Sequence, residues 1–165
     1  LVCDNKVYGL TKGQSSPTTD LGMKNALDPL GNQNTSFSPL AVALVAGAPF
    51  VARTFAGDPQ HMETVLREAI LFKGPSVVDI LQPCVSFNKV NTYAWYRERI
   101  YRMEQPQKDR YEAIRLAEGW GDRIPTGIFW RDGQFICREG KEMFRRHVTE
   151  SAVARLLNKP CIMMR

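Results

Sequence analysis

The opening residues of the chain, LVCDNKVYG, bring two oxygen atoms to a spacing that suits a metal ion. Residues 1–3 are apolar and predict a strand. Asp4 and Asn5 then leave the sheet at its carboxyl edge, where ligands bind in open parallel sheets. If the chain turns there, the side-chain oxygen of Asn5 and the backbone carbonyl of Val7 converge on one point. Two neutral oxygens at this spacing suit a hard cation such as Mg²⁺, which completes its shell with phosphate oxygens and water.

The next stretch, GLTKGQSS, has the composition of a phosphate-binding loop but not its spacing. Gly9 and Gly13 let the backbone approach a ligand closely. Lys12 precedes Gly13, however, so the stretch does not fit the GxxxxGK[ST] pattern of nucleotide hydrolases. On spacing alone, a structural loop whose Ser and Thr hydroxyls satisfy its own backbone explains the stretch better than a ligand site does.

The cysteines are widely spaced and form no CxxC pair, which suggests neither a zinc module nor a small disulfide framework. They are Cys3, Cys84, Cys137 and Cys161. Cys84 lies in LQPCVSF, directly after an apolar stretch. A lone cysteine in such a place is more often a small buried hydrophobic residue than a ligand. We expect reduced thiols.

Two helices are predicted from the same signal, a capping side chain followed by proline. Ser38 precedes Pro39, and Asp58 precedes Pro59. Proline is favoured at the first helical position because an N–H there would have no partner within the helix. Apolar residues recur at helical spacing through the second helix, and we expect Gly74 to end it.

The surrounding pattern predicts an α/β fold with a mostly parallel sheet flanked by helices. Residues 49–53 are strand-like. PSVVDIL, residues 75–81, is β-branched and continuously apolar at its centre, which is typical of a strand covered on both faces. The order strand, helix, strand indicates parallel pairing. Residues 6–37 are predicted to form one long polar loop.

The last part of the chain has a weaker pattern. Residues 93–103 and 109–118 predict helices, and a final helix is expected near residues 149–157. GIFW, a turn at Asp132 and Gly133, and QFIC together predict a short hairpin. We interpret residues 1–165 as part of a single domain, with residues 90–165 as a C-terminal extension.

Composition and charge argue against several classes of protein. The formal net charge of +5 is modest and the basic residues are scattered, so we expect no nucleic-acid partner. The longest nearly apolar run, residues 40–52, contains a proline and is shorter than the roughly 20 residues of a membrane helix. The start of the chain does not have the pattern of a signal peptide. We therefore expect a cytoplasmic protein with no membrane partner.

The segment DNKVYGLTKGQSSPTT closely resembles the thiamine-diphosphate segment of the β subunit of 2-oxoacid:ferredoxin oxidoreductases. The resemblance continues through GAPFVARTFAGDPQH, VVDILQPCVSFNKVNTYAWYRERIY and GWGDRIPTGIFW. It implies the C-terminal part of a thiamine-diphosphate-binding fold. It also implies oxidative decarboxylation of a 2-oxoacid, of the pyruvate or 2-oxoglutarate type, to acyl-CoA and carbon dioxide. Electrons would pass through an iron-sulfur cluster to ferredoxin.

The resemblance assigns roles to particular residues. Mg²⁺ would take ligands from Asn5, from the backbone carbonyl of Val7 and from an aspartate of an upstream GDG motif. The cofactor-binding residues would be Asn5, Val7, Tyr8, Gly9, Leu10, Thr11 and Lys12. Cys84 would be one ligand of a [4Fe-4S] cluster. The implied partners are the α subunit, ferredoxin, the 2-oxoacid and coenzyme A as co-substrate.

The chain departs from the family pattern because it has no GDG motif and lacks the upstream cluster cysteines. We therefore expect it to be the C-terminal half of a β subunit, whose N-terminal half is a partner that supplies those ligands. Two other interpretations stay open. A non-oxidative thiamine-diphosphate lyase or synthase would need the same Mg²⁺ site but no cluster ligand. A non-catalytic binding fragment would need neither, since half a cofactor site cannot turn over.

Overall fold

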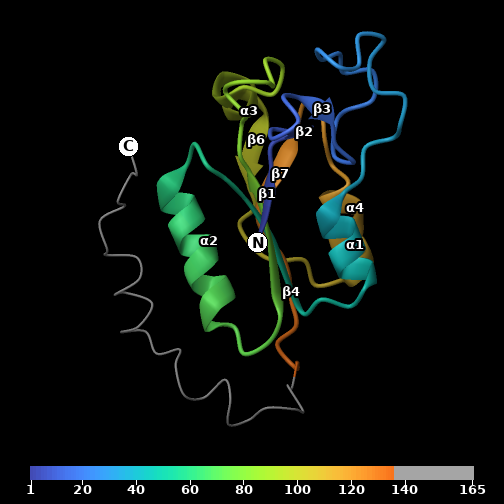
Figure 1. Cartoon of the computed structure of the whole chain (residues 1–165). Coiled ribbons are helices and arrows are strands. Elements are labelled where there is room, and N and C mark those ends of the chain that lie inside the picture. The colour runs from blue at the N-terminus through green and yellow to red at the C-terminus, as the bar shows by residue number, and fades with distance from the viewer. Residues whose placement is uncertain (136–165) are drawn as a thin grey trace.

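The fold is built on a five-stranded sheet flanked by helices, in a computed structural model that describes residues 1–135 (Figure 1). In their order across the sheet, the strands are β1 Val2–Asp4, β5 Ser76–Leu81, β4 Phe50–Phe55, β7 Ile124–Arg131 and β6 Ile100–Arg102. β1, β5 and β4 are parallel, β7 is antiparallel to β4, and β6 is parallel to β7. This arrangement confirms the predicted α/β fold with a mostly parallel sheet.

Helices cover both faces of this sheet. In the described residues they are α1 Pro39–Val45, α2 Pro59–Leu71, α3 Tyr93–Arg99 and α4 Arg110–Ala117. α2 lies on one face, and α1 and α4 lie side by side on the other (Figure 1). Val65 of α2 packs in one apolar cluster with Phe50, whereas Leu44 of α1 packs in another with Phe129. Burial of these two apolar layers holds the sheet between its helices.

The capping signals read from the sequence form the predicted contacts. The Ser38 hydroxyl accepts a hydrogen bond from the Ala41 amide at 3.3 Å and donates one to the Ala117 carbonyl at 3.0 Å. It therefore caps α1 and also ties it to α4. Asp58 accepts from the His61 amide at 3.3 Å and caps α2. Each cap contributes about 1 kcal/mol of stability.

Two helices end earlier than the sequence predicts. α2 ends at Leu71 rather than at Gly74, because the backbone of Phe72 is already extended. α3 ends at Arg99 rather than near residue 103, because residues 100–102 form β6. β6 pairs with β7, so its partner lies far along the chain and leaves no local signal.

The polar loop predicted over residues 6–37 contains a short hairpin. β2 Val7–Tyr8 pairs antiparallel with β3 Gln14–Ser15. Gly13 precedes β3 with a φ of 102°, and a Cβ atom there would lie 3.1 Å from the Cβ of Phe87. Only glycine tolerates both conditions without strain. The hairpin turn therefore packs closely against the segment that follows β5.

Some predictions fall outside the described residues. Half of the second strand of the predicted hairpin, residues 134–137, lies beyond residue 135. Cys137, Cys161 and the helix near residues 149–157 lie entirely beyond it. We predict that residues 90–165 form a C-terminal extension. Two strands from this range, β6 and β7, belong to the same sheet as β4. The extension itself stays a prediction. Within residues 1–135, no helix combines the length and apolar character needed to cross a membrane.

Candidate functional site

The predicted site lies where β1 and β5 end together. Asp4 at the end of β1 is in register with Leu81 at the end of β5, and the Gln82 amide donates to the Asp4 carbonyl at 2.9 Å. The chain leaves β1 into the turn at residues 4–7, which we call the ligand turn. The Asn88 side chain, from the segment after β5, donates to the Asn5 carbonyl at 3.1 Å. Two parts of the chain that are far apart in sequence thus meet at one carboxyl edge of the sheet.

The ligand turn is shaped by two local side-chain hydrogen bonds. Asn5 Oδ1 accepts from the Val7 amide at 3.1 Å, and Asp4 Oδ1 accepts from the Lys6 amide at 3.1 Å. Asn and Asp side chains form such turns because they reach the backbone two residues further on. Lys6 has a φ of 63°, a left-handed conformation that costs a non-glycine residue roughly 1–2 kcal/mol.

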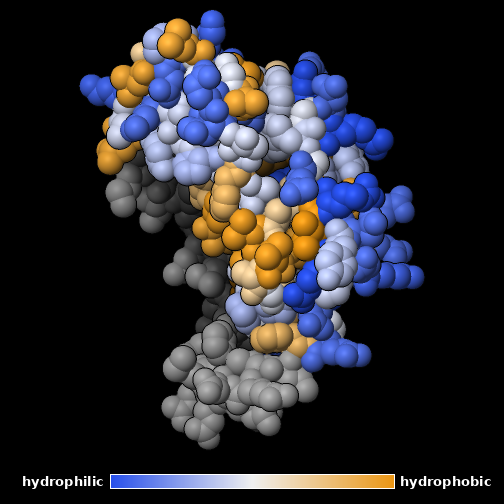
Figure 2. Space-filling view, turned by 90° about the vertical axis from the view of Figure 1, so that its right-hand side faces the viewer, coloured by the Kyte–Doolittle hydropathy of each residue, from blue (hydrophilic) through white to orange (hydrophobic). Residues whose placement is uncertain are grey.

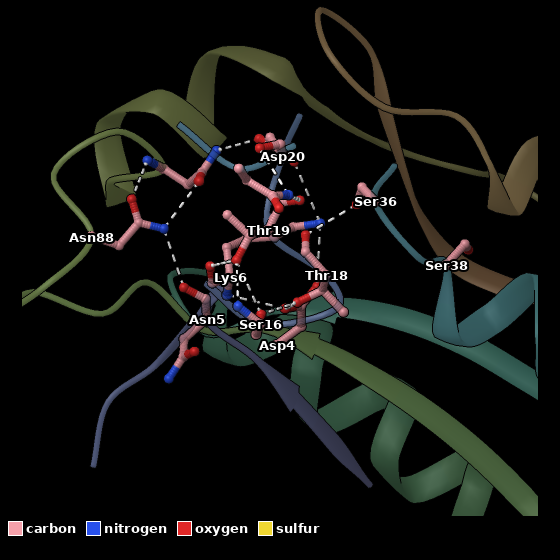
Figure 3. A network of polar contacts seen from close by, with 12 residues as sticks. Asp4, Asn5, Lys6, Ser16, Thr18, Thr19, Asp20, Ser36, Ser38 and Asn88 are labelled. Carbon is pink, nitrogen blue, oxygen red and sulfur yellow. Dashed lines mark hydrogen bonds and ion pairs between the residues drawn. The ribbon is translucent and has the colours of Figure 1, made fainter. Parts of the chain in front are cut away.

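A buried polar network lies behind the ligand turn (Figure 3). The Lys6 ammonium is 3.5 Å from Asp4 Oδ2 and 3.7 Å from Asp20 Oδ1, and it lies 3.6 Å from the centroid of the Trp120 ring. Asp4 also accepts from the Thr18 hydroxyl at 2.6 Å. The side-chain amide of Asn5 extends away from this network (Figure 3). Asp4 is thus engaged within the protein, while Asn5 is turned outward.

A second buried ion pair lies in the neighbouring strands. Arg53 of β4 donates from Nε to Asp79 Oδ2 of β5 at 3.0 Å, and from Nη2 to the Ala117 carbonyl at 3.3 Å. Both side chains are almost fully buried. Burial raises the pKa of Asp79, and the Arg53 guanidinium acts in the opposite direction. Separating the two side chains would leave each charge buried without a partner, which is strongly destabilising. The pair therefore holds β4 and β5 together.

The predicted cofactor-binding residues line an open pocket of about 730 Å³, with one exception. Those on the pocket wall are Asn5, Val7, Tyr8, Gly9, Leu10 and Thr11. Tyr8 is half exposed and Leu10 is fully exposed. Lys12 does not line this pocket. It is an exposed residue of the hairpin turn with a φ of 64°, and its amide donates to the Gly9 carbonyl at 3.0 Å.

One oxygen of the ligand turn is available to a cation such as Mg²⁺. Asn5 Oδ1 accepts one hydrogen bond and keeps a second lone pair for a cation. The nearby carboxylate of Asp4 is already used by Thr18 and Lys6. In residues 1–135, no three His, Cys, Asp or Glu side chains gather as a metal cage. Neutral oxygens without such a cage suit an ion whose remaining ligands come with its substrate or cofactor.

Cys84 is at the same edge of the sheet as the ligand turn. It lies half-buried in the segment after β5, and its carbonyl accepts from the Asn88 amide at 3.1 Å. Asn88 therefore contacts both Cys84 and Asn5. Among residues 1–135 the other cysteine, Cys3, is exposed on β1. An iron-sulfur cluster at Cys84 would thus take most of its ligands from outside the described residues.

Sequence reasoning missed the buried charges of this site. Lys6, Asp20, Arg53 and Trp120 were not predicted to act together, since they come from separate parts of the chain. A signal was present in the strands, because FVARTF and SVVDIL each place one charged residue inside an apolar run. Such a residue is almost never fully buried unless it is paired, so two of them in neighbouring strands indicate a buried ion pair.

Two protein families match consecutive parts of the chain. Residues 1–80 match the family described as "Thiamine pyrophosphate enzyme, C-terminal TPP binding domain". Residues 84–148 match the family that describes the C-terminal part of the pyruvate ferredoxin oxidoreductase β subunit. The fold and the family match thus indicate a thiamine-pyrophosphate enzyme domain.

Similar proteins narrow this class further. The β subunit of 2-oxoacid:ferredoxin oxidoreductase 1 from Aeropyrum pernix is 41% identical over 143 residues, which are 79% of this chain and 45% of that subunit. The corresponding β subunit from Saccharolobus solfataricus is 36% identical over 97% of this chain and 55% of its own length. A solved 2-oxoglutarate:ferredoxin oxidoreductase from Magnetococcus marinus, with 2-oxoglutarate, coenzyme A and succinyl-CoA bound, has a TM-score of 0.76 and 31% identity. This chain covers 57% of that one, and 96% of this chain is aligned.

The chain belongs to the family of 2-oxoacid:ferredoxin oxidoreductase β subunits. This confirms the family predicted from the sequence. The chain spans about half the length of the curated relatives it matches.

Proposed function

We propose that this chain is part of the thiamine-diphosphate-binding subunit of an enzyme that oxidatively decarboxylates a 2-oxoacid. The acyl group passes to coenzyme A and the electrons pass to ferredoxin. The observation that carries this proposal is the ligand turn, which presents Asn5 and Val7 at the joint carboxyl edge of β1 and β5. It lies within residues 1–80, which match the thiamine-pyrophosphate-binding family.

In this function Asn5 and the Val7 carbonyl would hold Mg²⁺, through which the diphosphate of the cofactor would be bound. Tyr8, Gly9, Leu10 and Thr11, which form the wall of the same pocket, would surround the cofactor. Lys12 lies in the turn beside them and adds a positive charge. When bound, the cofactor supplies the electron sink that decarboxylation requires, while the protein supplies orientation and electrostatics.

Cys84 is proposed as one thiolate ligand of the [4Fe-4S] cluster that takes the electrons from the site. Its place at the same sheet edge as the ligand turn supports this role, because Asn88 bonds to both segments. Clusters of this kind are held by cysteine thiolates. A non-oxidative lyase or synthase would use the ligand turn in the same way but would need no ligand at Cys84.

Exposed apolar side chains support assembly with other polypeptides. We propose that these are the α subunit and the rest of the β subunit. Figure 2 shows apolar side chains over α1, on the face turned toward the viewer. Val45 and Val42 of this helix are 74% and 50% exposed, and Phe37 before it is 44% exposed. Contiguous apolar surface of this kind marks protein contact sites.

The experiment for this proposal is a substrate panel on the native protein, purified anaerobically. Reduction of ferredoxin would be followed with pyruvate, 2-oxoglutarate and a longer 2-oxoacid, each with and without coenzyme A. The proposal predicts reduction that requires a 2-oxoacid, coenzyme A and thiamine diphosphate together. Decarboxylation that proceeds without coenzyme A and without ferredoxin reduction would instead identify a non-oxidative lyase.

A further inference from the structure

Lys6 combines two unfavourable features at a single position between the proposed metal ligands. Its side chain is only 4% exposed, and lysine is almost never fully buried without a partner. Its backbone has a φ of 63°, which few residues other than glycine adopt. Such features persist only where the surrounding structure holds them in place. The contacts of Lys6 therefore indicate its structural role in the ligand turn.

The ammonium group of Lys6 is held on several sides. It lies between the carboxylates of Asp4 and Asp20, at 3.5 Å and 3.7 Å, and 3.6 Å from the centroid of the Trp120 ring. Two carboxylates and an indole ring together compensate a buried cation. Asp20 is itself held, because its Oδ2 accepts from the Asn91 amide group at 3.2 Å. The side chain of Lys6 is thus anchored to the loop after the hairpin and to Trp120.

The backbone of Lys6 is fixed at both of its polar atoms. Its amide donates to Asp4 Oδ1 at 3.1 Å, and its carbonyl accepts from the Thr19 hydroxyl at 2.6 Å. The residue is therefore pinned by its side chain, its N–H and its C=O. With residue 6 fixed inward, the Asn5 amide extends in the other direction (Figure 3). There its Oδ1 meets the Val7 amide at 3.1 Å.

We propose that Lys6 is a positioning residue for the Mg²⁺ and thiamine-diphosphate site. Its buried ammonium holds the ligand turn in the left-handed conformation in which the Asn5 oxygen and the Val7 backbone lie together. This inference rests on the proposed function, because it assigns a role toward the same site. Lys6 is not itself one of the proposed ligands. It acts through its two neighbours, as residues behind metal ligands commonly do.

A glycine variant distinguishes a role of the Lys6 ammonium from a requirement for a positive φ alone. If only the positive φ mattered, glycine would serve better than lysine at this position. If the ammonium anchor matters, Lys6→Gly loses it and leaves the turn free to adopt other conformations. Lys6→Met removes the charge and keeps most of the apolar stem. Both variants therefore remove the same interaction, but only Lys6→Gly also relieves the backbone strain of the positive φ.

The test measures affinity rather than activity, on the native protein purified anaerobically and stripped of cofactor. Thiamine diphosphate is titrated calorimetrically in the presence of Mg²⁺, and binding of Mn²⁺ in place of Mg²⁺ is followed by paramagnetic resonance. Thermal melting without cofactor reports stability separately. Lys24→Met is the matched control, because Lys24 is an exposed lysine of the same loop region and its loss removes the same charge.

We expect Lys6→Met and Lys6→Gly to raise the Kd for thiamine diphosphate and for Mn²⁺ by about tenfold or more. Lys24→Met should leave both values unchanged. If Lys6→Met does not fold, Lys6→Gly and the milder Asp20→Asn still test the positioning role. Both should weaken the binding of thiamine diphosphate and Mn²⁺. Wild-type affinity in Lys6→Gly or Asp20→Asn, whatever the melting temperature, would overturn the positioning role. Absence of binding in the wild-type protein would instead refute the proposed function itself.

Discussion

The side-chain amide of Asn88 donates to the backbone carbonyl of Asn5 at 3.1 Å, and it thereby joins the segment after β5 to the ligand turn after β1. Asn88 is 2% exposed. Its amide also donates to Asn91 Oδ1 at 3.0 Å, and its own oxygen accepts from the amides of Val90 and Asn91. One buried side chain thus connects the proposed Mg²⁺ ligand with the segment that carries the proposed cluster ligand.

Asn88→Ala should destabilise the protein and weaken cofactor binding together. Loss of its buried hydrogen bonds leaves polar backbone groups unpaired, so we expect about 2 kcal/mol less free energy of unfolding. The affinity for thiamine diphosphate should fall as well, because the Asn5 carbonyl loses its anchor. Urea denaturation and calorimetric titration would measure the two effects. Asn34→Ala is the control, since Asn34 is exposed. Unchanged stability in Asn88→Ala would show that this contact does not hold the site.

Cys84→Ser should remove the proposed iron-sulfur cluster but leave thiamine-diphosphate binding intact. A serine hydroxyl replaces the thiolate poorly as a cluster ligand, so iron content and ferredoxin reduction should both fall. Iron analysis and the paramagnetic resonance spectrum of the reduced native protein would measure the loss. Cys3→Ser controls for the removal of a thiol and should leave the iron content unchanged. A full, spectroscopically unchanged cluster in Cys84→Ser would mean that this thiol only packs, and the lyase interpretation would gain.

His61 should make the stability of the fold depend on pH. Burial lowers its pKa below the usual 6.5, and the nearby Arg102 acts in the same direction, while Asp58 opposes them. The unfolded chain therefore binds a proton more readily than the folded chain does. As pH falls through about 6.5 toward the lowered value, the free energy of unfolding should fall with it.

The comparison of His61→Gln with the wild type tests this pH dependence. Denaturation at pH 8 and at pH 5.5 should show a smaller loss of stability in the variant, because glutamine does not titrate. The Nδ1 atom of His61 lies 3.3 Å from the Thr54 hydroxyl, and a glutamine amide can replace that contact. Equal losses in both proteins would assign the pH dependence to other groups.

Local signals in the sequence predicted the elements that depend on local interactions. Ser38 and Asp58 cap their helices as expected, and the strand predicted over residues 75–81 forms as β5 Ser76–Leu81. β6 was missed because a three-residue strand is specified by its partner β7, not by its own residues. Residues 100–102 continue a charged helix in sequence, so only the tertiary pairing ends that helix.

The same distinction explains which parts of the site were predicted. Asn5 and Val7 are two residues apart, so a local turn can bring them together, and the structure shows Asn5 Oδ1 accepting from the Val7 amide. The convergence of that oxygen with the Val7 carbonyl stays a prediction. The anchor of that turn could not be derived in this way. Lys6 depends on Asp20 and on Trp120, and no spacing rule connects a lysine with an indole ring so far along the chain.

Asn5→Ala is the sharpest test of whether the ligand turn holds Mg²⁺ and thiamine diphosphate. Alanine removes the outward-facing oxygen, which a methyl group cannot replace as a ligand. Calorimetric titration of the native protein with thiamine diphosphate in Mg²⁺ should show an affinity reduced by about tenfold or more relative to wild type. An Asn5→Ala protein that binds the cofactor with wild-type affinity would show that the ligand turn does not hold Mg²⁺ through Asn5.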